Sequence, residues 1–139
     1  MAKLLVVEDN PTNMKLAVLL LEQAGHTVIT AIDAEAGLLL ARDEQPQLIL
    51  MDIQLPGIDG LEATAQLKRS DVTRDIPVIA LTALAMQGDE ERIRAAGCDG
   101  YIAKPLRYQD FLATVAAHLA RTGRPAAPPP PDPLPGVSP

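Results

Sequence analysis

The chain has 139 residues, 47% of them hydrophobic but only 2% aromatic, and it carries a formal net charge of −6. This composition fits one domain of about 120 residues with an aliphatic core. The acidic balance weighs against a nucleic-acid-binding protein, because affinity for phosphate backbones comes from clustered Lys and Arg. The lone cysteine excludes an internal disulfide, and the apolar runs are too short to span a membrane, so we expect a cytoplasmic protein.

Five short apolar segments, separated by stretches long enough for a helix, predict the strands of one sheet. Runs of this length without polar alternation are typical of parallel strands that are buried on both faces. The expected strands are Leu4–Val7, Thr27–Ala31, Leu48–Met51, Val78–Leu81 and Tyr101–Ala103.

Each predicted strand is followed by a predicted helix with its own start or stop signal. Asn10-Pro11-Thr12 precedes the first helix and Gly25 stops it, while Asp59 with Glu62 forms a capping-box-like pair at the third. The helices are expected at 11 to about 24, 33 to about 43, from 59 onward, at about 88–96 and at about 107–121. Right-handed crossovers would place them on both faces of the sheet, so the predicted fold class is α/β, with five βα units.

The first predicted helix is apolar on two sides. The side expected to pack on the sheet consists of Met14, Ala17, Val18 and Leu21. Leu16, Leu19 and Leu20 fall on the opposite side, where a surface helix is normally polar. An exposed apolar cluster of this kind indicates a docking face for another helix.

The last helix and the residues after it differ sharply in composition. The helix has an apolar face made of Tyr108, Phe111, Leu112, Val115 and Leu119. Residues 122–139 are rich in proline and nearly free of apolar residues, which predicts a disordered or polyproline II tail without chemistry of its own. We therefore expect a domain at 1–121 and a tail at 122–139.

Residues able to hold a cation or a phosphoryl group follow four of the predicted strands. They are Glu8-Asp9, Asp52, Thr82 and Lys104-Pro105. Any one of them alone has an ordinary interpretation, such as a solvated strand end or a helix cap. Parallel strands present their carboxyl ends at one edge of a sheet, however, and ligands bind at that edge, so four such residues together predict a site.

The acidic residues of this set are suited to Mg²⁺, which prefers oxygen ligands and keeps several waters. Asp9 and Asp52 could ligate the ion directly, Glu8 could hold a coordinated water, and the Gln54 backbone carbonyl could complete the set. Three carboxylates would then be balanced by the ion and by the Lys104 ammonium, so the predicted cofactor is Mg²⁺.

A carboxylate can also accept a phosphoryl group and form an acyl phosphate. Asp52 is the best candidate because it follows the predicted central strand. Phosphoryl transfer chiefly needs positioning and neutralisation of three equatorial oxygens. The metal ion could take one, Lys104 a second, and the Thr82 hydroxyl with the Ala83 backbone N–H the third.

With these motifs in order and spacing, the chain resembles the receiver domains of two-component response regulators over residues 3 to about 121. The motifs that carry this resemblance are Val7-Glu8-Asp9-Asn10, Leu50-Met51-Asp52-Ile53-Gln54-Leu55-Pro56-Gly57, Ala80-Leu81-Thr82-Ala83 and Tyr101-Ile102-Ala103-Lys104-Pro105. Two further stretches, Asn13-Met14-Lys15-Leu16 and Gly88-Asp89-Glu90-Glu91-Arg92-Ile93-Arg94, resemble single-domain, DivK-like regulators and receiver modules of hybrid histidine kinases.

The resemblance implies a flavodoxin-like (CheY-like) sheet of order 2-1-3-4-5 and a phosphorylation switch. Asp52 would accept a phosphoryl group from a phosphohistidine, and the bond before Pro105 would be cis. Thr82 would move toward the acyl phosphate and Tyr101 would rotate inward, although an aromatic residue on a short edge strand is otherwise as readily a packing residue. The face of the fourth helix, fifth strand and fifth helix would then change shape.

The expected partners follow from this function. A histidine kinase or histidine phosphotransfer protein would dock on the leucines of the first helix, and an effector protein would read the switched face, without nucleic acid or membrane. The chain would catalyse its own phosphorylation and dephosphorylation and would have no diffusible organic substrate.

Three other functions compete with this interpretation. An aspartyl-phosphate phosphatase of the haloacid dehalogenase type would need a second Asp where this chain has Gln54. A flavodoxin-like cofactor binder would need a hydroxyl- and glycine-rich loop in place of Glu8-Asp9-Asn10-Pro11. A scaffold receiver without phosphorylation would leave the acid cluster, Thr82 and Lys104 unexplained.

Overall fold

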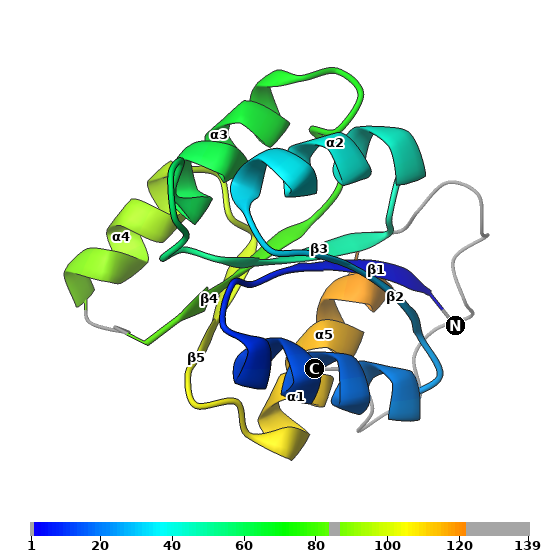
Figure 1. Ribbon diagram of the computed structural model, residues 1–139. Coiled ribbons are helices and arrows are strands. Elements are labelled where there is room, and N and C mark those ends of the chain that lie inside the picture. The colour runs from blue at the N-terminus through cyan, green and yellow to red at the C-terminus, as the bar shows by residue number, and fades with distance from the viewer. Residues whose placement is uncertain (1, 84–86, 122–139) are drawn as a thin grey trace.

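The computed structural model describes residues 2–83 and 87–121, in which five strands alternate with five helices (Figure 1). The elements are β1 (Lys3–Val7), α1 (Pro11–Gln23), β2 (Thr27–Ala31), α2 (Ala34–Glu44), β3 (Leu48–Asp52), α3 (Gly60–Arg69), β4 (Val78–Thr82), α4 (Gln87–Ala95), β5 (Gly100–Ala103) and α5 (Tyr108–Arg121). All five strands pair in parallel in the order β2-β1-β3-β4-β5. The predicted fold class and strand order are confirmed.

The sheet is buried on both faces, which explains why its strands lack polar alternation. Successive residues of β1 point to opposite sides, so that Leu4 and Val6 belong to one core cluster and Leu5 and Val7 to the other. Helices α2 and α3 cover one face and α1 and α5 the other (Figure 1).

The helix starts use the predicted side chains. Asn10, Asp33 and Asp59 are the N-caps of α1, α2 and α3, and each side-chain oxygen accepts a hydrogen bond from the backbone N–H three residues later. Such bonds satisfy donors that a helix leaves free at its first turn. Beyond α1, Gly25 adopts a φ of 94°, a conformation that other residues rarely reach.

The packing of α1 corrects one prediction about its leucines. Leu20 is 6% exposed and belongs to the core cluster, and Leu16 is half-buried against the same cluster. Only Leu19, at 50% exposure, lies open as expected. Helix α1 contacts α5 as well as the sheet. Its buried face is therefore wider than that of a helix that packs on a sheet alone.

The apolar face predicted for α5 is also partly wrong. Phe111 and Val115 are fully buried, and Leu112 and Leu119 pack against the same cluster, but Tyr108 is 57% exposed. Tyr108 is the first residue of the helix.

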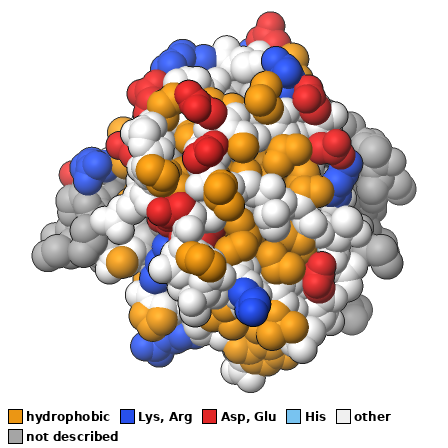
Figure 2. Space-filling model, in the orientation of Figure 1, with side chains coloured by type: hydrophobic (Ala, Val, Ile, Leu, Met, Phe, Trp, Pro, Cys, Tyr) orange, Lys and Arg blue, Asp and Glu red, His pale blue; other side chains and the backbone are white. Residues whose placement is uncertain are grey.

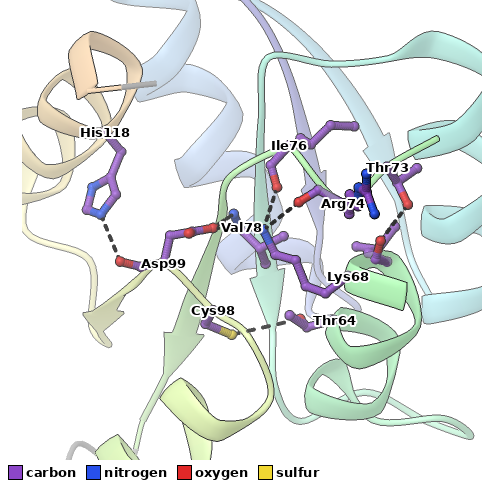
Figure 3. Close-up of polar contacts among 10 residues, drawn as sticks. Thr64, Lys68, Thr73, Arg74, Ile76, Val78, Cys98, Asp99 and His118 are labelled. Atoms are coloured by element: carbon purple, nitrogen blue, oxygen red, sulfur yellow. Dashed lines mark hydrogen bonds and ion pairs between the residues drawn. The ribbon is translucent and has the colours of Figure 1, made fainter. Parts of the chain in front are cut away.

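A polar network joins the loop before β5 to α3, β4 and α5 (Figure 3). The Lys68 amine donates to the Asp99 carboxylate at 3.0 Å and to the backbone carbonyl of Ile76 at 2.9 Å. The same carboxylate accepts from the Val78 backbone N–H at 2.8 Å, and the Asp99 carbonyl lies 3.2 Å from Nε2 of His118. The start of β5 is thereby fixed to three neighbouring elements.

Two expectations about the whole chain have different outcomes. No helix within residues 2–83 and 87–121 is long and apolar enough to cross a membrane. The tail predicted at 122–139 lies outside the described residues, so the domain boundary stays a prediction.

Candidate functional site

The register of the sheet places the predicted site residues side by side at the carboxyl edge. Val7 pairs with Met51, so the next residues, Glu8 and Asp52, are neighbours at the ends of β1 and β3. On the other side of β3, Thr82 is the last residue of β4 and pairs with Ala103 of β5, which is followed by Lys104. Four strands therefore contribute to one location.

Lys104 is the cation at the centre of this location. Its Nζ lies 2.9 Å from Oε1 of Glu8 and 3.1 Å from Oδ2 of Asp52, so that it connects the two carboxylates. The Lys104 backbone N–H donates to the Thr82 carbonyl at 2.7 Å, which fixes the start of the loop after β5. The peptide bond between Lys104 and Pro105 is cis, as the resemblance implied.

The carboxylates are held by backbone donors as well. The Asn10 N–H donates to Oε2 of Glu8 at 3.1 Å, and the Gln54 N–H donates to Oδ1 of Asp52 at 2.9 Å. Glu8 is 1% exposed and Asp52 3% exposed, whereas Asp9 is exposed. Two buried anions with one lysine between them carry an excess of negative charge, and carboxylates out of water are costly unless they are paired.

This excess of negative charge is reflected in the pKa values of Glu8 and Lys104. Burial raises the pKa of Glu8, and the neighbouring Asp52 carboxylate raises it further, against the opposing effect of Lys104. Burial by itself lowers the pKa of Lys104, but its interactions with the Glu8 and Asp52 carboxylates outweigh burial, so its pKa is raised. Lys104 is therefore held in the charged form, and a further cation at the site would favour the charged form of Glu8 as well.

The arrangement fits a divalent cation. Oxygen atoms of Glu8, Asp9 and Asp52 lie within 4.8 Å of one another. Among the described residues, Oε1 of Glu8 is a buried oxygen that accepts no hydrogen bond of good geometry, even though the Lys104 amine is close. A hard cation with oxygen ligands would satisfy that atom and offset the charge of the acids. The carbonyl of the exposed Gln54 lies in the loop that follows Asp52.

The remaining predicted residues flank this centre. Thr82 is 1% exposed at the end of β4, and Ala83 follows it at the surface. Tyr101 lies on β5, half-buried, two residues before the Ala103 that pairs with Thr82. The spatial grouping of the acids, Thr82 and Lys104 is as the sequence led us to expect.

Gly60 is a contributor that sequence reasoning missed. A Cβ at this position would lie 2.1 Å from the backbone carbonyl oxygen of Asp52 and 2.7 Å from the Cα of Ile53. The Gly60 N–H also donates to the Ile53 carbonyl at 3.2 Å. Helix α3 thus begins in direct contact with the backbone that carries Asp52. A glycine directly after the Asp59 cap is the signal that could have indicated this close approach.

A largely apolar groove of about 520 Å³ runs from the acidic cluster along α1. Glu8 and Asp9 lie at one end of it, and its lining includes Met14, Leu19 and Ile32. Ile32 is 67% exposed and Leu19 is 50% exposed. In Figure 2, apolar side chains gather over the lower part of the visible face, where Figure 1 places α1.

Comparisons with known proteins place these features in context. Residues 4–116 match the model of the response regulator receiver domain. The polar-differentiation response regulator DivK of Brucella anthropi is 51% identical over 115 residues, which are 83% of this chain and 94% of that protein.

Solved structures are similar in both fold and sequence. The receiver domain of the sensor histidine kinase PA1611 from Pseudomonas aeruginosa, which has a magnesium ion coordinated in its active site cleft, is 34% identical with a TM-score of 0.80, covering 85% of this chain and 97% of that one. The chemotaxis protein CheY4 of Vibrio cholerae is 26% identical with a TM-score of 0.79, covering 84% and 97%.

Proposed function

Because the chain belongs to the response regulator receiver domain family, we propose that it is a DivK-like regulator that accepts a phosphoryl group from a phosphohistidine onto Asp52. The observation that supports this most strongly is the contact of one buried lysine with two buried carboxylates at a parallel sheet edge. That arrangement supplies a nucleophile, a fixed positive charge and a cation site in one place.

In the proposed reaction, a carboxylate oxygen of Asp52 attacks phosphorus in line with the leaving imidazole. The new O–P bond forms as the N–P bond breaks, and the imidazole nitrogen keeps the electron pair. The Lys104 ammonium and the Thr82 hydroxyl with the Ala83 N–H would neutralise the transferred oxygens. Bound Mg²⁺, held by Glu8, Asp9, Asp52 and the Gln54 carbonyl, would supply the remaining positive charge.

We include a switch in this proposal. One new charged group at Asp52 would favour one of two packings near Thr82 and Tyr101, so that the face formed by α4, β5 and α5 changes shape and controls an effector protein. The chain would act as a signalling module that catalyses its own phosphorylation and dephosphorylation in the cytoplasm, and not as an enzyme with a diffusible substrate.

The decisive experiment is labelling with a small phosphodonor. Incubated with acetyl phosphate and Mg²⁺, the protein is expected to gain the mass of one phosphoryl group, with the hydroxylamine sensitivity of an acyl phosphate. The gain should vanish with EDTA and in Asp52→Asn, while Asp59→Asn, which changes an exposed capping carboxylate, should keep it. No gain in mass at saturating donor, or full labelling of Asp52→Asn, would contradict the proposal.

The groove along α1 supports a docking site for the phosphodonor protein. It begins at Glu8 and Asp9, so a helical bundle that presents a phosphohistidine to Asp52 would cover it. We therefore propose the exposed residues Leu19 and Ile32 as docking contacts. They take the place of the predicted set of Leu16, Leu19 and Leu20, because Leu20 lies in the core.

Leu19→Asp is expected to slow phosphotransfer from a histidine kinase or phosphotransfer protein about tenfold or more, as truncation of an interface anchor does. Leu39→Asp is a matched control, because Leu39 of α2 is 52% exposed. Labelling by acetyl phosphate should be normal in both variants. A loss of labelling from both donors, or equal effects of the two substitutions, would exclude docking at Leu19.

A further inference from the structure

The strand that leads to Lys104 is tied to α4 by a hydrogen bond between two side chains. The Tyr101 hydroxyl of β5 donates to the Glu90 carboxylate of α4. Glu90 lies three residues before Ile93, which is 1% exposed, so both side chains lie on the same face of the helix. Since α4 contacts β5, this face is the one turned toward the strand.

The other end of the connection between α4 and β5 is fixed independently. Asp99, just before β5, is held by the amine of Lys68 (Figure 3). Its carboxylate also accepts from the Val78 backbone N–H, and its own N–H donates to the Val78 carbonyl. A Cβ at Gly97 would lie 2.8 Å from Cγ of Lys68, so the end of α4 is closely packed as well. Several interactions thus hold the start of β5, whereas the Glu90 bond acts nearer the start of α4.

Tyr101 is closely connected to the proposed phosphorylation site. It lies two residues before Ala103, the partner of Thr82, and three before Lys104, whose amine contacts Asp52. It also lines a cavity of about 320 Å³ together with Lys104 and Pro105. A movement of Thr82 or Lys104 can therefore be transmitted to Tyr101 through one short strand. Tyr101 lies beside a cavity that its ring could enter.

The chemistry of the bond favours its persistence at neutral pH. A hydrogen bond to a carboxylate is stronger than one between neutral groups. The bond to Glu90 raises the pKa of Tyr101, and burial and the negative charge of Glu90 add to this, while Arg94 opposes it. The hydroxyl therefore remains a donor and the carboxylate an acceptor.

We propose that Glu90 is a positioning residue that holds Tyr101 against α4 in the unphosphorylated protein, so that the Glu90–Tyr101 bond and phosphorylation of Asp52 oppose each other. This inference rests on the proposed function. Opposition of this kind is reciprocal: whatever weakens the bond must strengthen binding of a phosphoryl group or its mimic at Asp52 by the same factor.

The bond itself can be tested without any phosphorylation. The chain has two tyrosines and no tryptophan, so Tyr108→Phe leaves Tyr101 as the only strong emitter. A carboxylate that accepts from tyrosine quenches its fluorescence, and Glu90→Gln in this background should raise the emission. Glu91→Gln removes the same charge from the next residue of the helix, which is exposed, and should leave the emission unchanged.

The coupling is tested with beryllofluoride and Mg²⁺, which stand in for the phosphoryl group. Binding is followed by the rise in melting temperature with ligand concentration. Glu90→Gln is expected to lower the half-saturating concentration about threefold to tenfold, in keeping with a partly exposed charged hydrogen bond. Glu91→Gln should match the parent protein.

Each result decides one part of the inference. Equal emission in Glu90→Gln and the parent would exclude the hydrogen bond. Raised emission with unchanged beryllofluoride binding would exclude its coupling to Asp52. Failure of the parent protein to bind beryllofluoride would contradict the proposed function and the coupling with it, while the emission measurement would still establish whether Glu90 holds Tyr101.

Discussion

Replacement of Lys104 by Met is expected to slow phosphoryl transfer to Asp52 by about 10²–10³-fold, the usual effect of removing one preorganised charge that faces a transition state. Methionine keeps an unbranched chain of similar length but not the ammonium that lies 3.1 Å from Asp52 and 2.9 Å from Glu8. The measurement is the initial rate of labelling by acetyl phosphate at saturating Mg²⁺.

The same substitution should increase the affinity for Mg²⁺, because three nearby carboxylates would lose a neighbouring positive charge. Opposite changes in metal affinity and labelling rate would separate the role of Lys104 from general damage to the fold. Lys3→Met is the control, since its amine pairs with Glu44 at the amino end of β1. A normal labelling rate in Lys104→Met would remove Lys104 from the mechanism.

Phe111→Ala is expected to cost about 3–5 kcal/mol of the free energy of unfolding, the range for truncation of a buried aromatic side chain. Phe111 is the only phenylalanine in the chain and is fully buried between α5 and the sheet. A domain of this size has about 5–15 kcal/mol in total, so the variant should lose a large share of its stability.

Urea unfolding gives the comparison directly. Tyr108→Ala, three residues earlier on the same helix, removes a side chain that is 57% exposed and should change the free energy of unfolding by no more than about 0.5 kcal/mol. Similar costs for the two substitutions would mean that α5 is not packed as described.

The sheet and the site were predictable because both depend on short-range signals. Strands that are buried on both faces appear in the sequence as continuous apolar runs. For β1, β3, β4 and β5, the predicted end of the strand agrees with the observed end to within one residue. The carboxyl ends of parallel strands meet, so the residues after these runs had to be neighbours. Glu8, Asp52 and Lys104 needed no further information to be grouped.

Contacts between elements far apart in the sequence were not predictable in the same way. Leu20 belongs to a core cluster that includes residues of both the sheet and α5, and α1 contacts α5. The helical periodicity of α1 alone does not indicate that second neighbour. The bond between Glu90 and Tyr101 and the pairing of Lys68 with Asp99 join residues that no local pattern connects. These contacts are properties of tertiary packing.

Assembly of the site from four strands has a consequence for incomplete chains. The essential groups are drawn from positions as distant as Glu8 and Lys104, and pairing of β1, β3, β4 and β5 is what brings them together. A nascent or proteolysed fragment that lacks any of these strands would not form the site that accepts the phosphoryl group. Only fully folded molecules would then be phosphorylated. Truncated copies would remain unphosphorylated without a separate mechanism to exclude them.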